Sequence, residues 1–198
     1  MRNMIWRQVR FFLVLLGGYL AQACIMPYLQ VGSVTPSMLV VTIAVITVGY
    51  GRLRAFWAGA FYGIVTETFL ASVPMFNLML YPVCALLCSV PCADKSAARL
   101  QYERSIGKVG RNRSPLLRTV ICAVLNGVCI EVVNLVYMYL NDAALTASAV
   151  GRALLCIGST AALTALLMVP LRKLLGFRKP KTEPTPQLRF GKPMRLED

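Results

Sequence analysis

The chain has 198 residues, a formal net charge of +13 at pH 7 and 57% hydrophobic residues. Soluble domains average about 45–50% apolar residues, so this composition excludes an ordinary soluble protein and favours a protein embedded in lipid. The 21 Lys and Arg residues stand between apolar segments, as topology signals do. This placement argues against nucleic-acid binding despite the positive charge.

Six apolar segments are candidates for transmembrane helices, which need roughly 17–25 mostly apolar residues. In chain order the predicted spans cover residues 9–29, 36–50, 55–71, 74–93, 116–140 and 149–171. The first is too long for a removable signal peptide, and the second is short. Pro82 and Pro91 predict a kink or an early end in the fourth. The sequence therefore predicts an all-α membrane protein, a polytopic bundle of six transmembrane helices within residues 1–176.

Basic residues alternate strictly between the segments that connect these spans. Three lie in residues 2–10, at the start of the first span, two in residues 51–54, seven in residues 94–118 and eight from Arg172 onward, whereas the other three connections have none. Only Arg152, near the start of the sixth span, falls outside these groups. The positive-inside rule then places both termini in the cytoplasm, N-in and C-in. Residues 94–115 become a cytoplasmic basic loop, and the charged, proline-containing residues 177–198 become a disordered cytoplasmic tail. We expect these basic residues to attract anionic lipids of the inner leaflet.

Two carboxylates, Glu67 and Glu131, fall inside predicted spans, where an ionisable group is a candidate functional residue. Asn77 and Asn134 are further polar candidates within the spans. Each acid follows small residues spaced by four, which we expect to form a helix-packing interface: Ala55, Gly59 and Gly63 before Glu67, and Ala123 and Gly127 before Glu131. Each acid also lies 13 residues after an arginine, Arg54 or Arg118, or about 20 Å along a helix. Both are thus predicted at similar depth, toward the outer leaflet.

Three interpretations of the acids stay open. Each Glu is protonated and hydrogen-bonds a neighbouring helix, or it meets a partner's membrane helix, or it forms a proton or cation site. Gly59 and Gly63 make a GxxxG pattern, which lets two helix backbones approach closely. We therefore expect the face of Gly59, Gly63 and Glu67 to matter more than Glu131 for assembly with a partner.

The sequence has no set of residues typical of catalysis. It has no His, no cluster with metal-ligand spacing and no phosphate-binding loop. Cys84, Cys88 and Cys92 recur every four residues and share a helix face, which we interpret as a packing stripe of small residues. We predict a protein that is not an enzyme and that needs no metal or cofactor.

The third and fourth predicted spans contain a run, GAFYGIVTETFLASVPMFN over residues 59–77, that resembles the bacterial rod shape-determining protein MreD family. In that family a glycine-rich helix carries an acid four residues after a glycine, followed by a short Ser/Gly/Pro turn and a helix that often starts with Asn. Glu67 matches the acid and Asn77 the polar residue. Ser72 and Pro74 match the turn, but Ala71 and Met75 stand where the family usually has glycines.

Two other segments are similar to the same family: the second span after Pro36, and the acid Glu131 in the fifth span. The resemblance implies a non-enzymatic scaffold subunit of the bacterial cell-wall elongation complex, located in the cytoplasmic membrane. Its implied partners are the membrane protein MreC, the actin-like MreB, and the lateral-wall glycosyltransferase and transpeptidase. The alternative is a substrate-binding membrane subunit of an energy-coupling-factor vitamin transporter, in which Glu67 and Glu131 line a pocket for a small molecule.

Overall fold

The computed structural model describes residues 2–70, 75–92, 114–141 and 146–176. Within these residues the prediction of an all-helical protein is confirmed, since no strand occurs in them. The elements are α1 (Arg2–Cys24), the 3-10 helix η1 (Met26–Tyr28), α2 (Met38–Tyr50), α3 (Arg52–Leu70), α4 (Phe76–Cys92), α6 (Pro115–Leu140) and α7 (Ala147–Leu174). The predicted tail, and all but the last two residues of the predicted basic loop, lie outside the described residues.

Three helical segments are long and apolar enough to cross a membrane: Gln8–Tyr28, Pro115–Leu140 and Ala147–Leu174. They indicate a membrane protein. By contrast, α2 and α4 have only 13 and 17 residues. A 13-residue helix is about 20 Å long, which is shorter than the hydrocarbon core of about 30 Å.

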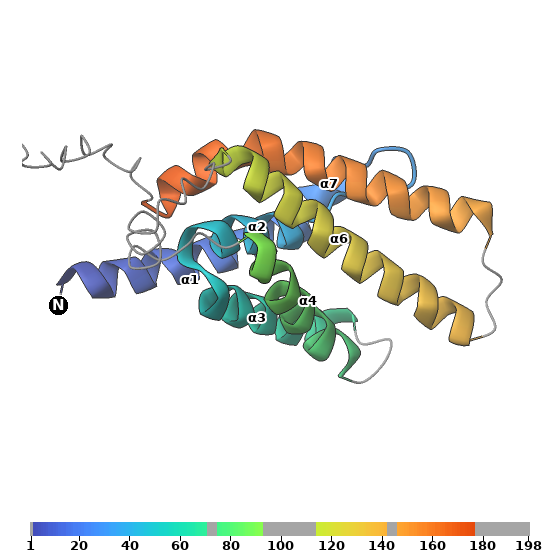
Figure 1. The fold of residues 1–198 in the computed structure, drawn as a ribbon, viewed down its shortest axis with the longest axis horizontal. Coiled ribbons are helices and arrows are strands. Elements are labelled where there is room, and N and C mark those ends of the chain that lie inside the picture. Colours follow the sequence, from blue (N-terminus) through green and yellow to red (C-terminus); the bar gives the residue numbers. More distant parts are fainter. Residues whose placement is uncertain (1, 71–74, 93–113, 142–145, 177–198) are drawn as a thin grey trace, which may run out of the picture.

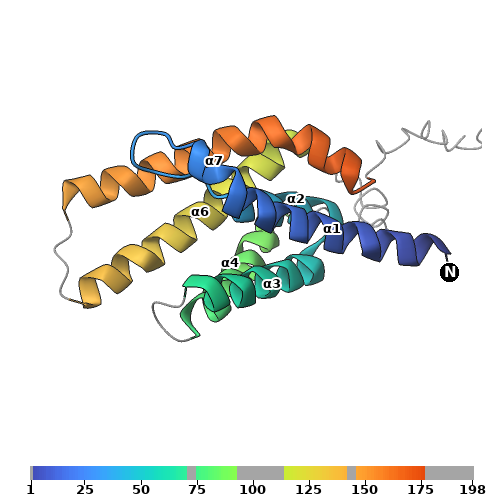
Figure 2. The ribbon, with the colours of Figure 1, turned by 180° about the vertical axis from the view of Figure 1, so that it is seen from behind.

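Helix α2 lies at the centre of the molecule. Every residue from Met38 to Val48 is buried, because a helix that is apolar on all sides must be covered on all sides. It contacts α1, α3, α4, α6 and α7. Figure 1 shows α2 between the α3–α4 pair and the α6–α7 pair. Figure 2, seen from behind, shows α1 running along α2 on that side.

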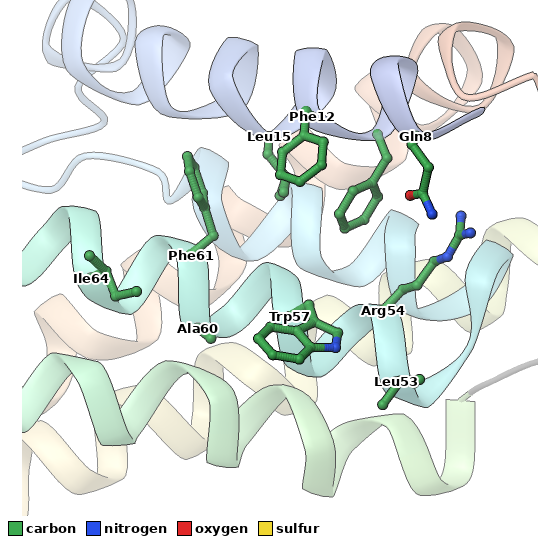
Figure 3. Close-up of a pocket in the computed structure, with 10 residues that line it drawn as sticks. Gln8, Phe12, Leu15, Leu53, Arg54, Trp57, Ala60, Phe61 and Ile64 are labelled. Carbon is green, nitrogen blue, oxygen red and sulfur yellow. The ribbon is translucent and has the colours of Figure 1, made fainter. Parts of the chain in front are cut away.

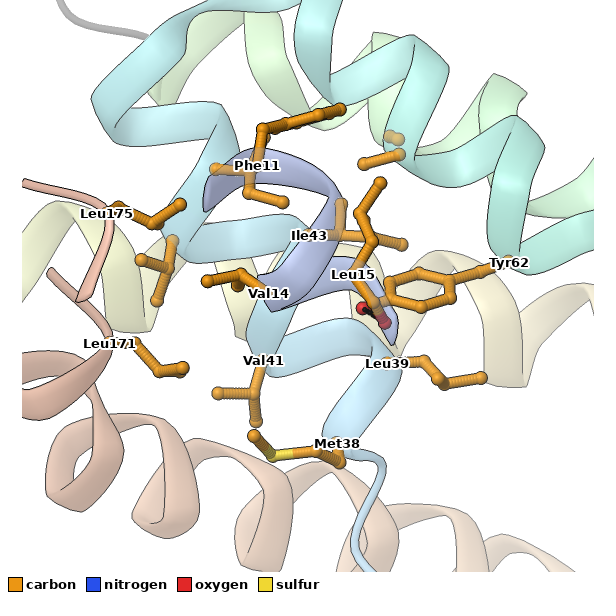
Figure 4. Close-up of a cluster of buried hydrophobic side chains, with 14 of the residues drawn as sticks. Phe11, Val14, Leu15, Met38, Leu39, Val41, Ile43, Tyr62, Leu171 and Leu175 are labelled. Carbon is orange, nitrogen blue, oxygen red and sulfur yellow. Dashed lines mark hydrogen bonds between the residues drawn. The ribbon is translucent and has the colours of Figure 1, made fainter. Parts of the chain in front are cut away.

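The main core packs residues of α1, α3 and α7, with Met26 of η1 and Ala85 of α4, around α2 (Figure 4). Most of its members are aliphatic, and Tyr62 of α3 is fully buried among them. Its hydroxyl donates a hydrogen bond to the Leu15 carbonyl oxygen of α1 at 3.1 Å. Gly18 gives the hydroxyl its room, since a Cβ there would lie 2.5 Å from the Tyr62 oxygen. This contact fixes α1 against α3 near the middle of both helices.

The pair α3 and α4 packs more closely than side chains would allow, because two glycines face the backbone of α4. A Cβ on Gly59 would lie 2.8 Å from the Pro82 Cα atom, and a Cβ on Gly63 would lie 2.8 Å from the Asn77 carbonyl oxygen. The GxxxG face is therefore covered by the protein's own α4. No room is left for a partner's helix at Gly59 and Gly63. That this face matters more than Glu131 for assembly with a partner stays a prediction.

The first prediction concerns this contact. Replacing Gly63 with Leu should lower the free energy of unfolding by about 3 kcal/mol, since overpacking a filled contact forces backbone to move. Gly158→Leu on α7 is the matched control, because a Cβ there meets nothing within 4 Å. Unfolding of both variants in mild detergent, followed by circular dichroism, measures the difference. Equal stability of the two variants would contradict the close α3–α4 contact.

Candidate functional site

The carboxylate of Glu67 caps the N-terminus of α4. One oxygen accepts a hydrogen bond from the Met75 backbone N–H at 2.6 Å, and the other accepts one from the Asn77 backbone N–H at 3.1 Å. The first N–H groups of a helix have no acceptor within the helix, and the positive end of the helix dipole favours a negative group there. Both oxygens of Glu67 are thus engaged by backbone. Asn77 contributes to this cap through its backbone N–H.

Met75, just before α4, has a φ of +63°. This left-handed conformation costs a residue with a side chain about 1–2 kcal/mol, whereas glycine adopts it readily. The conformation turns the Met75 N–H toward Glu67, so the cap and the strained residue belong to one turn. The strain is local, because the Met75 side chain is exposed.

The N-terminus of α2 is capped by side chains of two other helices and by Ser37, the residue just before it. The Met38 N–H donates to the Gln22 Oε1 atom of α1 at 2.6 Å, and the Ser37 N–H donates to the Thr160 Oγ1 atom of α7 at 3.0 Å. The Ser37 hydroxyl in turn accepts from the Val40 N–H. The buried start of α2 therefore gathers polar groups from α1 and α7 into the interior.

A cavity of about 190 Å³ lies beside this helix start. Its walls combine polar groups from four helices and the segment before α2: Gln22, Thr35, Ser37, Tyr81, Glu131, Asn134, Cys156 and Thr160. Gly127 and Ile157 are among the apolar residues that complete it. The cavity has the volume of a few water molecules or of one small polar molecule, at about 30 Å³ per water.

Glu131 and Asn134, one turn apart on α6, supply the acidic and amide groups of this cavity. The Cys156 thiol donates a hydrogen bond to the Thr35 carbonyl oxygen at 3.9 Å. Cys156 and Tyr81 both lie within electrostatic range of the Glu131 carboxylate. The Tyr81 hydroxyl lies near Thr66 of α3. A carboxylate, an amide and several hydroxyls around one space can bind a proton, a small cation or a ligand with hydrogen-bond donors.

The two carboxylates that the sequence predicts at similar depth have different neighbours in the structure. Glu67 caps α4, and Glu131 lines the cavity. The small residues before them also meet different neighbours. Ala123 joins a cluster with residues of α2 and α4, whereas a Cβ on Gly127 would lie 3.5 Å from the Ile157 side chain of α7. Ala55 is fully buried near the other end of α3.

The cysteine stripe on α4 faces cysteines of α6. The Cys88 and Cys129 sulfur atoms are 3.7 Å apart, and Cys92 and Cys122 belong to the same buried cluster. Among the described residues, no group of three or more His, Cys, Asp or Glu side chains has an arrangement that would hold a metal ion. The thiols thus fill the α4–α6 contact as small polarisable groups.

Of the residues that line the cavity, Ser37 could be recognised from the sequence, because it stands between Pro36 and a long apolar run, as a helix N-cap does. The others have no such pattern. Gln22 and Thr160 lie 16 and 123 residues from the backbone groups that they cap, so no local pattern relates them. Tyr81 lies between two stretches of apolar residues in α4.

Comparisons with known proteins give no relatives. No protein-family model matches the chain, and neither a curated protein nor a solved structure matches it.

The second prediction tests the cap of α4. Glu67→Ala removes the acceptor of two N–H groups and should lower the unfolding free energy by about 2 kcal/mol. Glu67→Gln keeps one side-chain oxygen and the shape, and should lower it by about 1 kcal/mol. Chemical unfolding of both variants in detergent measures the difference. An alanine variant as stable as the parent would show that the cap contributes nothing.

The third prediction concerns the strained turn. Met75→Gly should raise the unfolding free energy by up to about 1 kcal/mol, because the relief of the left-handed conformation exceeds the added entropy of the unfolded chain. Met79→Gly, one turn later on α4 and equally exposed, is the matched control and should lower it by about 1 kcal/mol. If both variants lose stability equally, Met75 is not strained.

Proposed function

We propose that the chain is a non-enzymatic membrane scaffold of a bacterial cell-wall elongation complex, similar to MreD, in the cytoplasmic membrane. One observation supports this proposal above the others. The described residues of the run that resembles that family form a single structural unit: Gly59 and Gly63 receive α4, and Glu67 caps it through the N–H groups of Met75 and Asn77.

The geometry of this unit favours a structural role over a chemical one. Both oxygens of Glu67 accept hydrogen bonds from backbone N–H groups. The acid of this run therefore holds α3 and α4 together. Large apolar side chains cover the outer faces, as on α4, where Met79, Val83 and Leu87 are exposed. A rigid helix pair with apolar outer faces suits contact with lipid and with the membrane helices of partners such as MreC.

The proposed topology has six crossings with both ends in the cytoplasm. Three segments with basic residues come together at one end of the bundle, which supports this arrangement. The Tyr50 hydroxyl donates to the Leu175 carbonyl oxygen at 3.2 Å, and the Arg54 guanidinium lies 4.4 Å from the Tyr50 ring centroid. A Cβ on Gly176, after α7, would lie 2.8 Å from the Arg10 guanidinium of α1. Under the positive-inside rule this end faces the cytoplasm.

A second candidate function is favoured by the cavity beside α2. In a substrate-binding subunit of an energy-coupling-factor transporter, the Glu131 carboxylate would bind a small molecule that enters from outside. The cavity is smaller than the roughly 300–1,000 Å³ of common small-molecule sites, which favours the scaffold.

The fourth prediction decides between the two functions. The full chain, tagged at its C-terminus, is expressed with the MreC-type protein and the transporter ATPases of its own organism and purified in mild detergent. We expect the MreC-type protein to co-purify, and to do so equally with a Glu131→Gln variant, since that residue lies inside the bundle.

Native mass spectrometry of the same preparation supplies the opposing outcome. Co-purification of transporter ATPases, together with a small molecule that the Glu131→Gln variant loses, would reject the scaffold and establish the binding subunit. Purification with neither partner would reject both functions.

A further inference from the structure

The cavity beside the start of α2 differs from the apolar hollows of the bundle. Figure 3 shows one of these hollows, between α1 and α3, whose walls are mainly aromatic and aliphatic side chains such as Phe12, Trp57 and Phe61. Another lies between α4 and α6. Lipid chains, which are as apolar as leucine, can cover walls of this kind. The cavity beside α2 instead presents a carboxylate and several polar oxygens, which lipid chains do not satisfy.

Hydrogen bonds at the start of α2 orient two of the oxygens of this cavity. Gln22 Oε1 accepts from the Met38 N–H at 2.6 Å, and Thr160 Oγ1 accepts from the Ser37 N–H at 3.0 Å. An amide or hydroxyl oxygen has two lone pairs, so each of these oxygens keeps one for a further interaction. The two backbone donors are therefore satisfied, while both acceptor residues also line the cavity.

Among its described lining residues, the cavity has one negative group and no positive one. Glu131 supplies the carboxylate. Arg152 lies one turn before Cys156 on α7, but its side chain is exposed. The positive end of α2 stabilises a nearby negative charge by about 0.3–1 kcal/mol, which offsets only part of the several kcal/mol that a carboxylate loses on leaving water. An ionised Glu131 therefore needs a positive counter-charge.

We propose that this cavity binds one monovalent metal cation, Na⁺ or K⁺, between the Glu131 carboxylate and the amide and hydroxyl oxygens around it. Gln22 and Asn134 provide the amides, and Thr160 provides a hydroxyl. One carboxylate neutralises one positive charge, whereas a divalent ion would leave a net charge inside the bundle. Oxygen atoms are the ligands of hard cations. The volume of about 190 Å³ holds the ion with a few waters, at about 30 Å³ per water.

The cavity also gives such an ion a way in. Glu131, Asn134 and Tyr81 are half-buried, whereas Thr160 is only 2% exposed. The cavity is thus closed toward α7 at Thr160 and more open toward α4 and α6. The sequence has no metal-ligand spacing because the proposed oxygens come from α1, α6 and α7. The ion would neutralise the interior of a scaffold or of a binding subunit alike, so the proposal rests on neither function.

The fifth prediction measures the ion on the full chain, purified in mild detergent with choline chloride as the salt. Sodium chloride or potassium chloride then replaces choline chloride at constant total chloride, at a pH of about 8, so that protons compete little for the carboxylate. We expect one of the two salts to raise the thermal unfolding midpoint, because a ligand that binds only the folded state stabilises it. Comparison of the salts identifies the ion, and equilibrium binding of its radioactive isotope should give one site per chain.

Three variants locate the ion. Glu131→Gln removes the charge with little change in shape and should weaken ion binding by about 10-fold to 100-fold. Glu67→Gln, the matched control, removes the same charge from the cap of α4 and should leave ion binding unchanged. Asn134→Ala keeps the Glu131 charge and should weaken binding by about fivefold, so it tests the site even where Glu131→Gln does not fold.

Several outcomes would overturn the proposal. If neither salt raises the midpoint above its value in choline chloride, no monovalent metal ion balances Glu131. An equal loss of binding in the Glu131→Gln and Glu67→Gln variants, or undiminished binding in Asn134→Ala, would place the ion outside the cavity. Stabilisation by calcium chloride alone would contradict the argument from a single carboxylate.

Discussion

The complete burial of α2 determines much of the rest of the structure. A helix without a polar face must be enclosed, and α2 contacts all five other long helices of the described residues. Its 13 residues, about 20 Å, are too few to cross a hydrocarbon core, and its start lies against α1 and α7. Backbone N–H groups inside the protein need acceptors from protein, and Gln22 and Thr160 provide them. The polar cavity with Glu131 lies where these acceptors meet, so it follows from the short central helix.

Glu67 and Glu131 have similar sequence surroundings, but the side chains and backbone around them in the structure differ, and these determine what each carboxylate does. Glu67 and Glu131 have the same distance from an arginine and the same small-residue spacing before them. Glu67 faces a helix start only eight residues ahead in the chain, and its carboxylate satisfies backbone donors there. Glu131 faces a helix start that Gln22, Ser37 and Thr160 already cap, and its carboxylate is left to line a space. An acid that is fully engaged stabilises the fold, whereas one that lines a cavity can exchange a proton or a ligand.

The helix positions could be predicted from the sequence because hydropathy and breaker residues act locally. Each predicted span overlaps one α-helix, the first also covers η1, and the glycine spacing on α3 correctly indicated close packing. The identity of the helix in that contact could not be predicted, because GxxxG specifies how near a backbone comes and not which backbone it is. The residues around Glu131 could not be predicted either, because the cavity combines residues that lie far apart in the sequence, such as Gln22 and Thr160. One feature of the sequence pointed to the left-handed conformation of Met75: it stands where the family that the run resembles usually has glycine.

The α3–α4 unit also bears on how a scaffold of this kind can assemble with partners. Because Gly59 and Gly63 are used within the chain, a partner has to bind faces with large side chains, where helices cannot approach as closely. Association then depends on shape and on total apolar area more than on one close contact. An apolar groove between α4 and α6, lined by residues such as Met79 and Val133, is one such surface.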